Sequence, residues 1–567
     1  MHSMRSPALL ALCLGSAGLT AVVAPAYAAT PAARTAAAAC PVSKPTFATP
    51  TYVDTGRAGG EPQVETAAGG RLLYSSHAGT THIFAPAGAS PTTAAFPQNY
   101  TGQTYIWTSD DQGKSWQFRD RSNPTQGGAP LTGFSDPEFA VDSAGGIFFS
   151  EINLANVATY ASKDNGTTYQ LKKLNGLTLT DRQWMEADRP NEYYIAANSF
   201  GGDTSPVSTS PLSHYLAKTT DGGASFTPSV VDEKGGSGLG DNKVDKRNGT
   251  FYEPHYAGDR STPQPLYVAA FRSAREGVLT DPDLGLIAPD VALLAHWPSI
   301  DVASDGSIYA TWDESGEGPR PAGVYFSSSG DGGRTWLAPK RLDSDGRTDI
   351  WPWLAVGDSG RVAVAWLEAD VALPKEDAQT PGTHGWRVMM VETTSGLGCA
   401  GGAPVFSAPT AATPDPVHTG TICQGGTVCQ AQAIDRRMGD YFSVGVDATG
   451  AAFVGVSDTR KGGAVSLPLF VRQSGGTSLL SPPPARPTFS VPTAAAGTGQ
   501  GTSSRQGTVP SKARQPSARG ATSSRGPAKA VQPTRTLAFT GPLPLLAPAG
   551  LLLLAAALWL RRRRATR

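Results

Sequence analysis

The sequence predicts an all-β protein, a β-propeller with seven blades as the preferred count and six as the second. Three observations lead to this prediction. One turn motif recurs four times at wide intervals, seven strand-turn-strand units accompany it, and Gly and Pro are abundant, at 65 and 46 of 567 residues. A self-similar unit repeated at wide spacing indicates a propeller or a solenoid, and abundant turn residues suit many short strands.

Each copy of the turn motif has a hydroxyl residue, an Asp, a Gly, a second hydroxyl residue and an aromatic residue at fixed spacing. The copies are Ser109-x-Asp111-x-Gly113-x-Ser115-Trp116, Ser162-x-Asp164-x-Gly166-x-Thr168-Tyr169, Thr219-x-Asp221-x-Gly223-x-Ser225-Phe226 and Ser329-x-Asp331-x-Gly333-x-Thr335-Trp336. In a tight hairpin the Asp carboxylate accepts hydrogen bonds from turn amides and the Gly adopts a positive φ, so turn chemistry explains every position without a catalytic role. The spacing resembles the Asp-box, or BNR repeat, of sialidases and other propellers. The resemblance implies that each copy lies between the third and fourth strands of a blade.

Seven units each read as two adjacent strands joined by a tight turn. They begin near Pro62, Pro137, Trp184, Val244, Pro298, Pro352 and Phe442. The seven units give the preferred count of seven blades, and the turn motifs follow units one, two, three and five. We expect the ring to close by pairing of a strand within residues 46–53 with the last blade.

The N-terminus predicts export. Arg5, an apolar run over residues 8–23 and Ala26-Tyr27-Ala28 form a secretory signal peptide over residues 1–28. Its removal leaves an even number of cysteines for an oxidising compartment, which favours two disulfides. Cys423 with Cys429 is the first choice, and Cys40 with Cys399 then follows.

The C-terminal region follows the predicted propeller, residues 45–480. Residues 481–536 are rich in Pro, Ser, Ala and Arg without an acidic residue, so they predict a disordered, wall-spanning linker. After it come Leu-Ala-Phe-Thr-Gly at 537–541, an apolar transmembrane segment at 542–560 and a basic cytoplasmic tail at 561–567.

This order resembles the sorting signal of Gram-positive surface proteins, in the Leu-Ala-x-Thr-Gly variant of actinobacterial class E sortases. The resemblance implies that a sortase cuts between Thr540 and Gly541 and joins Thr540 to peptidoglycan. A plain membrane anchor is the alternative, because about 20 apolar residues span a bilayer. Both interpretations place the propeller on the cell surface.

Charge is unevenly distributed along the chain. All 47 acidic residues lie between residues 45 and 480, whereas 16 of the 47 basic residues lie outside this range, so the predicted propeller carries about −16. This charge argues against nucleic acid as a partner. The acidic excess permits a bound cation such as Ca²⁺, but no loop motif specifies one, no cofactor is identified and the metal ligands stay unknown.

Candidate site residues lie just before the first strand of each unit and at the end of the second strand. In propellers these positions share the face where ligands bind, and here they include His77, Asp136 and Trp297. We expect catalytic roles for Asp181, Glu253, Asp440 and Tyr441, and substrate-binding roles for Glu61, Arg182, His296, Trp312, Trp351 and Arg460. Carboxylates, arginines and aromatic rings together suit a sugar site. The alternative is a scaffold in which these charges only join neighbouring blades.

Residues 45–480 resemble the sialidase superfamily as a whole. The resemblance implies an arginine triad, a Tyr nucleophile with a Glu partner and an Asp acid/base, for which Arg182, Arg436, Arg437, Arg460 and Tyr441 are available. Where the family has Arg-Ile-Pro, this chain reads Gly60-Glu61-Pro62, and an acidic residue there would repel a sialate carboxylate.

Taken with the candidate site residues, the resemblance predicts a glycoside hydrolase acting on an extracellular glycan or glycoprotein. The alternative is a non-catalytic surface adhesin that binds a glycan or a protein.

Overall fold

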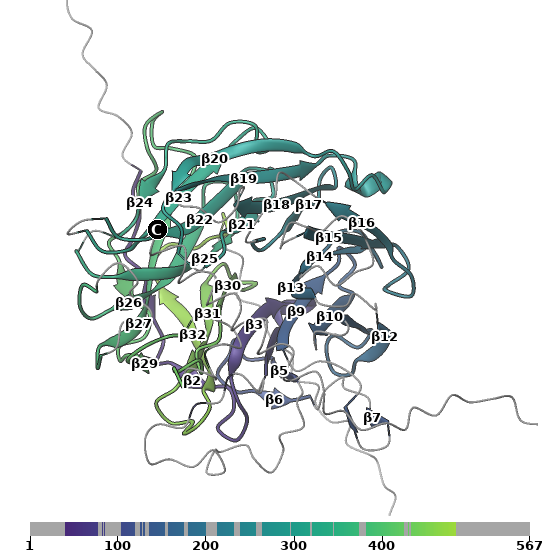
Figure 1. Cartoon of the computed structure of the whole chain (residues 1–567), viewed down its shortest axis with the longest axis horizontal. Coiled ribbons are helices and arrows are strands. Elements are labelled where there is room, and N and C mark those ends of the chain that lie inside the picture. Colours follow the sequence, from purple (N-terminus) through teal and green to yellow (C-terminus); the bar gives the residue numbers. More distant parts are fainter. Residues whose placement is uncertain are drawn as a thin grey trace, which may run out of the picture. The chain divides into compact units, whose positions relative to one another are not determined.

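Seven antiparallel sheets form the blades of a β-propeller (Figure 1). The structure is a computed structural model that describes residues 40–77, 82, 84, 104–119, 125–126, 129–130, 135–152, 157–174, 180–199, 213–231, 239–256, 263–294, 296–317, 320–343, 345–373, 382–423, 429 and 433–482. The predicted signal peptide, the sorting motif with Thr540 and Gly541, the transmembrane segment and the basic tail lie outside these residues, as does all of the linker except its first two residues. Within the described ranges, no helix has the length and apolar character needed to cross a membrane.

The first three blades follow the order of the chain. Blade 1 contains β3 (Gly60–Thr66), β4 (Leu72–His77), β5 (Thr104–Ser109) and β6 (Gln117–Phe118). Blade 2 contains β9 (Ser135–Val141), β10 (Ile147–Ile152), β11 (Val157–Ser162) and β12 (Gln170–Leu174). Blade 3 contains β13 (Thr180–Ala187), β14 (Tyr193–Ser199), β15 (Ser213–Thr219) and β16 (Thr227–Val231). A small two-stranded sheet, β7 (Thr125–Gln126) with β8 (Ala129–Pro130), lies in the chain between blades 1 and 2.

The next three blades repeat this arrangement. Blade 4 contains β17 (Lys243–Asp245), β18 (Thr250–Tyr256), β19 (Gln264–Phe271) and β20 (Asp283–Val291). Blade 5 contains β21 (Ser299–Val302), β22 (Ile308–Glu314), β23 (Gly323–Ser329) and β24 (Lys340–Arg341). Blade 6 contains β25 (Asp349–Val356), β26 (Val362–Ala369), β27 (Gly385–Thr393) and β28 (Thr410–Ala411), with β29 (His418–Thr419) also on β27. The helices described are single 3₁₀ turns, η1 (Ala68–Gly70) and η4 (Ala274–Glu276).

Blade 7 combines the two ends of the described chain. Its strands β30 (Ser443–Val446), β31 (Ala452–Asp458) and β32 (Leu467–Gly475) are completed by β1 (Thr46–Phe47) and β2 (Thr51–Tyr52), which both pair with β32. The predicted count of seven blades and the predicted closure by residues 46–53 are both confirmed. Ring closure in this way leaves no exposed gap between the first and last blades, and the edge of β32 is covered.

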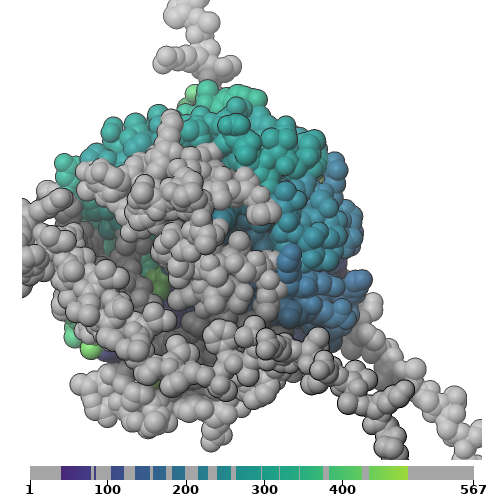
Figure 2. Space-filling view, turned by 45° about the vertical axis from the view of Figure 1, so that its right-hand side comes forward, coloured from purple at the N-terminus to yellow at the C-terminus, as the bar shows by residue number. Residues whose placement is uncertain are grey.

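The first strands of the blades contact one another in a closed ring, in the order β3, β9, β13, β17, β21, β25, β30 and back to β3. Figure 1 looks down this ring, with the first strands around the centre and β12, β16, β20 and β24 at the periphery. Figure 2 shows successive blades following one another around the outer surface, from blue to teal. Apolar side chains fill the space between neighbouring sheets; Val64 and Tyr74 of blade 1, for example, pack with Phe453 and Phe470 of blade 7.

The four turn motifs form the same turn, each between the third and fourth strands of blades 1, 2, 3 and 5. In the first copy, Ser109 Oγ accepts a hydrogen bond from the Gly113 amide at 2.9 Å, and Asp111 Oδ1 accepts one from the Ser115 amide at 2.9 Å. In the third copy, hydrogen bonds from Ser225 lower the pKa of Asp221 to about 2. These carboxylates are therefore used within their own turns, as turn chemistry predicts.

Glu392 of β27 gives the fold a dependence on pH. It is fully buried, its Oε2 accepts the Thr477 amide at 3.2 Å, and burial raises its pKa to about 8. An unfolded glutamate loses its proton above a pH of about 4.3, whereas the folded protein retains it, so this group's contribution to stability is complete below that pH and declines as the pH rises toward 8.

We therefore expect Glu392→Gln to stabilise the protein at pH 8 by about 2 kcal/mol, because one pKa unit corresponds to about 1.4 kcal/mol and relaxation around the charge reduces the full value. At pH 4 the variant and the parent should unfold at the same temperature. Thermal unfolding at both pH values measures this, with the exposed Glu276→Gln as the matched control. Equal stabilisation at both pH values would contradict a role for the buried proton.

Candidate functional site

Four first strands begin with the same backbone irregularity. Glu61, Asp136, Arg182 and Trp351 have φ values of 47°, 50°, 59° and 58°. At each of them, three residue steps on the first strand face two on the second, which is a one-residue β-bulge. Such left-handed residues cost on the order of 1–3 kcal/mol each and gather at functional sites, and bulges redirect side chains. The repetition marks this end of the first strands as the candidate site.

An ion-pair network joins blades 3 and 7 across this end of the ring. The buried Asp440 carboxylate accepts hydrogen bonds from Arg182, on β13, and from Arg436, four residues before Asp440. Burial raises the pKa of Asp440, but Arg436 and Arg182 outweigh this effect and hold the pKa below its usual value. Asp440 is thus an ionised partner of two guanidinium groups and is poorly suited to donate a proton.

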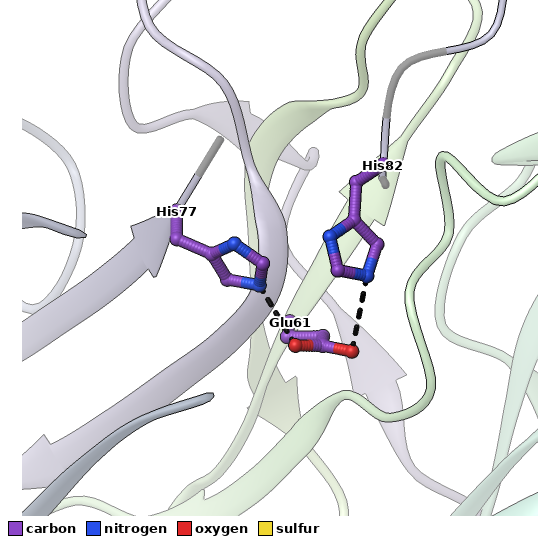
Figure 3. Close-up of side chains that lie close together, drawn as sticks. All are labelled: Glu61, His77 and His82. Atoms are coloured by element: carbon purple, nitrogen blue, oxygen red, sulfur yellow. Dashed lines mark hydrogen bonds and ion pairs between the residues drawn. The ribbon is translucent and has the colours of Figure 1, made fainter. Parts of the chain in front are cut away.

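Glu61 is the centre of a second group (Figure 3). Its two carboxylate oxygens lie 2.7 Å from His77 Nε2 and 3.2 Å from His82 Nε2, and the two imidazole rings meet edge to face with centroids 4.6 Å apart. Burial raises the pKa of Glu61, but the two histidines outweigh it and hold the pKa well below its usual value. Burial lowers the pKa of His82 to about 4, so its imidazole is neutral at neutral pH.

Ser135 connects Glu61 to a second carboxylate. Its hydroxyl lies 2.6 Å from Asp136 Oδ1 and 3.5 Å from Glu61 Oε2. Asp136 Oδ2 also accepts the backbone amide of Arg182 at 3.2 Å. Blades 1, 2 and 3 are therefore linked through polar groups at the same end of the ring.

Aromatic side chains surround the arginine. Trp297, which is half-buried, lies under the Arg182 guanidinium with Cζ 3.5 Å from its ring centroid. His296 stacks on Trp351 with centroids 5.5 Å apart and an interplanar angle of 14°. Burial lowers the pKa of His296 to about 3. We call the whole set, Glu61, His77, His82, Asp136, Arg182, His296, Trp297, Trp351, Arg436 and Asp440, the axial cluster.

Tyr441 directs its ring into the core next to the cluster. It packs between Trp184 and Trp353, at centroid distances of 5.4 and 6.0 Å, and burial raises its pKa well above the usual value. This environment stabilises the phenol against the phenolate. Within the described residues Tyr441 packs as a core side chain, and the nucleophilic role that the sequence suggested stays a prediction.

Other predicted site residues lie in different surroundings. Trp312 stacks on Tyr325 and donates from Nε1 to Glu314 at 3.0 Å within the core of blade 5. Arg460 belongs to a separate ion-pair group with Asp458 and Asp415. Glu253 is buried in β18 opposite Ala269. Asp181 pairs with Asn198 through the backbone, and its side chain lies outside the described ones.

Both predicted disulfide pairs are bonded in the structure. Cys40 is joined to Cys399, and Cys423 to Cys429. The second bond lies beside the axial cluster, because the Cys423 carbonyl accepts a hydrogen bond from Arg436 at 3.4 Å.

Sequence reasoning missed His82 and Ser135. His82 lies five residues beyond the end of β4, whereas sequence reasoning selected only residues at the end of each second strand, such as His77. The one signal available was the presence of two of the chain's eight histidines within six positions. Ser135 carries no signal, because its role arises only from the contact between blades 1 and 2.

A cavity of about 690 Å³ continues along the inside of the ring, lined mainly by the first strands. Its polar residues include Glu65, Glu138, Glu186 and Asp241, with Lys243 Nζ 2.9 Å from Asp241 and 3.8 Å from Glu186. Burial raises the pKa of Glu65 to about 7 and that of Asp241 to about 6. These contacts between neighbouring first strands are those of a charged scaffold.

Comparison with known proteins gives similarities to solved structures only. No protein-family model and no curated protein matches the chain. A protein of unknown function from Dyadobacter fermentans is 14% identical, with 76% of this chain and 99% of that chain covered and a TM-score of 0.37. An α-L-arabinofuranosidase mutant from Fusarium graminearum in complex with an iminosugar inhibitor is 14% identical, with 76% and 97% covered and a TM-score of 0.38. A Hadza microbial sialidase is 13% identical, with 56% and 66% covered and a TM-score of 0.36. At these identities and scores, the similarities assign no activity to this chain.

Proposed function

We propose that this chain is a cell-surface propeller that binds an extracellular glycan at the axial cluster. The observation that carries the proposal is the repeated left-handed bulge at Glu61, Asp136, Arg182 and Trp351. Four left-handed residues at equivalent positions of four blades each cost free energy. Strain kept at the same place in several blades is best explained by a ligand that these side chains recognise.

The chemistry of the cluster suits a sugar. Carboxylates accept paired hydrogen bonds from neighbouring hydroxyls and guanidinium groups donate them, and the half-buried Trp297 offers aromatic surface beside its contact with Arg182. Buried polar atoms without a hydrogen-bond partner among the described residues include Arg436 Nε, Trp351 Nε1 and His82 Nδ1. Buried polar groups are nearly always satisfied by protein, water or ligand, so these atoms support a polar ligand at this end of the ring.

Glycoside hydrolysis is the second candidate function, and one observation favours it. The Ser135 hydroxyl contacts both Glu61 and Asp136, at 3.5 and 2.6 Å. One hydroxyl can contact both carboxylates only if they lie within about 6 Å of each other, and retaining glycosidases hold their two carboxyl groups about 5–5.5 Å apart. The ionised state of Glu61 leaves Asp136 as the group to test as acid.

We also propose that the propeller is exported and held at the cell wall. The signal peptide over residues 1–28, the Leu-Ala-x-Thr-Gly motif at 537–541 and the apolar segment that follows support this placement. A class E sortase and peptidoglycan are then its partners during anchoring.

The test measures binding and turnover with the purified full-length chain. Binding to a glycan array, followed by calorimetry on the strongest glycan, is expected to fall at least about 10-fold in Trp297→Ala and Arg182→Gln, since each loses a contact worth 1.4 kcal/mol or more. Arg460→Gln is the matched control, because Arg460 lies in another ion-pair group. Thermal unfolding of each variant separates loss of binding from loss of fold.

Turnover is measured on chromogenic glycosides, including sialosides and arabinofuranosides, with Asp136→Asn as the variant. Turnover lost in Asp136→Asn with unchanged thermal unfolding would establish the hydrolase. Glycan binding without turnover would establish the binding protein. A chain that binds no glycan and hydrolyses none would contradict both functions.

A further inference from the structure

Glu61, His77 and His82 have the donor atoms and the spacing of a metal site. Their ligand atoms, one carboxylate oxygen and two imidazole nitrogens, all lie within 4.8 Å of one another. The three residues are 0%, 0% and 4% exposed. In Figure 3 the two imidazoles approach the carboxylate from either side, and each presents Nε2 to a different oxygen. Such a convergence of three buried donors needs a physical reason.

The distances suit a small divalent ion. Zinc binds nitrogen and oxygen at about 2.0–2.2 Å in tetrahedral sites, so two of its ligand atoms lie roughly 3.3 Å apart. The Glu61 oxygens lie 2.7 Å from His77 Nε2 and 3.2 Å from His82 Nε2. The two contacts fall on different carboxylate oxygens, and the three ligand atoms lie within 4.8 Å of one another, so they would draw together around an ion that one of these oxygens binds.

The backbone around Glu61 fixes its carboxylate. The Asp440 amide donates to Oε1 at 3.1 Å, and the Ser135 hydroxyl lies 3.5 Å from Oε2. Gly439, at φ 73°, makes room for the side chain, because a Cβ there would lie 2.5 Å from Glu61 Cγ. Outer contacts that orient a ligating carboxylate are typical of metal sites and affect metal affinity strongly.

Hydrogen bonding alone explains the group less completely. A neutral imidazole that only satisfies a buried carboxylate uses one nitrogen as the donor and pairs the other elsewhere. Neither ring nitrogen of His82 makes a hydrogen bond within the described residues, although Nε2 is buried and lies 3.2 Å from Glu61 Oε1. Arg436 Nη2 lies 3.9 Å from Glu61 Oε1, but the shorter contacts of this guanidinium go to Asp440. Within the described residues, Glu61 therefore has no guanidinium in hydrogen-bond contact, and an additional cation can bind its carboxylate.

We propose that Glu61, His77 and His82 bind a divalent transition-metal ion of the zinc class. Two imidazoles and one carboxylate form the three-ligand set of a site that retains a position for water or substrate. Calcium is disfavoured at this place, because it takes six to eight oxygen ligands. The proposal does not depend on glycan binding, since an ion held by these three residues requires no sugar.

The test uses the purified full-length chain without substrate. Elemental analysis after purification, and calorimetric titration of the EDTA-treated chain with ZnCl₂, are expected to give one equivalent of zinc per chain. Co²⁺ in place of Zn²⁺ should give the visible absorption bands of a four- or five-coordinate ion. CaCl₂ should give no binding heat at this site.

Variants then locate the ion. His77→Ala and His82→Ala are each expected to weaken zinc binding at least about 100-fold, because a lost ligand costs more than the 10- to 100-fold of an outer contact. His384→Ala is the matched control, a similarly buried histidine outside the cluster. If either variant fails to fold, the stoichiometry and the Co²⁺ spectrum of the unchanged chain still decide. No zinc above the buffer level, or equal zinc affinity in His82→Ala and His384→Ala, would overturn the proposal.

Discussion

Replacing Cys40 and Cys399 together by Ser is expected to lower the free energy of unfolding by about 5 kcal/mol. The disulfide joins residues 359 positions apart and ties the segment before β1 to the turn after β27. A cross-link restricts the unfolded chain more as its loop grows, so loop entropy alone predicts a loss of ~6 kcal/mol here and ~2 kcal/mol for a loop of about six residues. The bond also holds β1 in place, where it completes the last blade.

The matched control is Cys423→Ser with Cys429→Ser, whose sequence separation is 6. Urea unfolding of both double variants, and of the parent in reducing buffer, measures the two losses. In reducing buffer, we expect the free energy of unfolding of the parent to fall by the sum of the losses in the two double variants. A larger loss for the short loop than for the long one would show that the bond between Cys40 and Cys399 does not stabilise ring closure.

Asp440→Asn is expected to destabilise the protein by about 3–5 kcal/mol, because removing one partner of a buried ion pair leaves the other charges uncompensated. Both Arg182 and Arg436 depend on this carboxylate, and all three side chains are at least nine-tenths buried. The substitution retains the shape of the side chain, so the loss reports its charge. Chemical unfolding at neutral pH measures the difference.

Asp415→Asn is the control, since Asp415 is 75% exposed and pairs with Arg460 at 3.3 Å. Exposed ion pairs of this kind contribute little, so this variant should unfold like the parent. If Asp440→Asn does the same, the charged network does not stabilise the fold.

Much of the architecture follows from local patterns. Alternating strands and tight turns recur at each unit, and the hydroxyl and Asp side chains that define the turn motif bond to groups of the same turn, so both can be recognised in the chain without tertiary information. The closing strand and the cysteine pairs could also be predicted, because a ring of blades needs one strand to join its ends.

The candidate site is different, because its contacts join residues that are distant in the sequence. Asp440 meets Arg182, 258 positions away, and His82 reaches Glu61 beyond the end of a second strand. Counting positions before each first strand correctly selected Glu61, Arg182 and Asp440 as neighbours, but it could not separate Tyr441, which enters the core, from Asp440 beside it. That difference depends on side-chain direction, which the one-residue bulges and the packing of Trp184 and Trp353 determine.

The sequence by itself thus determined the seven blades, the turns, the closing strand and the disulfide pairs, since each depends on local periodicity or on a small number of possible partners. Only the tertiary structure decided which charged and aromatic residues meet at the axis, that Asp440 is held by two arginines, and that two histidines enclose Glu61. The physical reason is that burial and pairing set the chemistry of an ionisable group, and both are properties of the assembled ring.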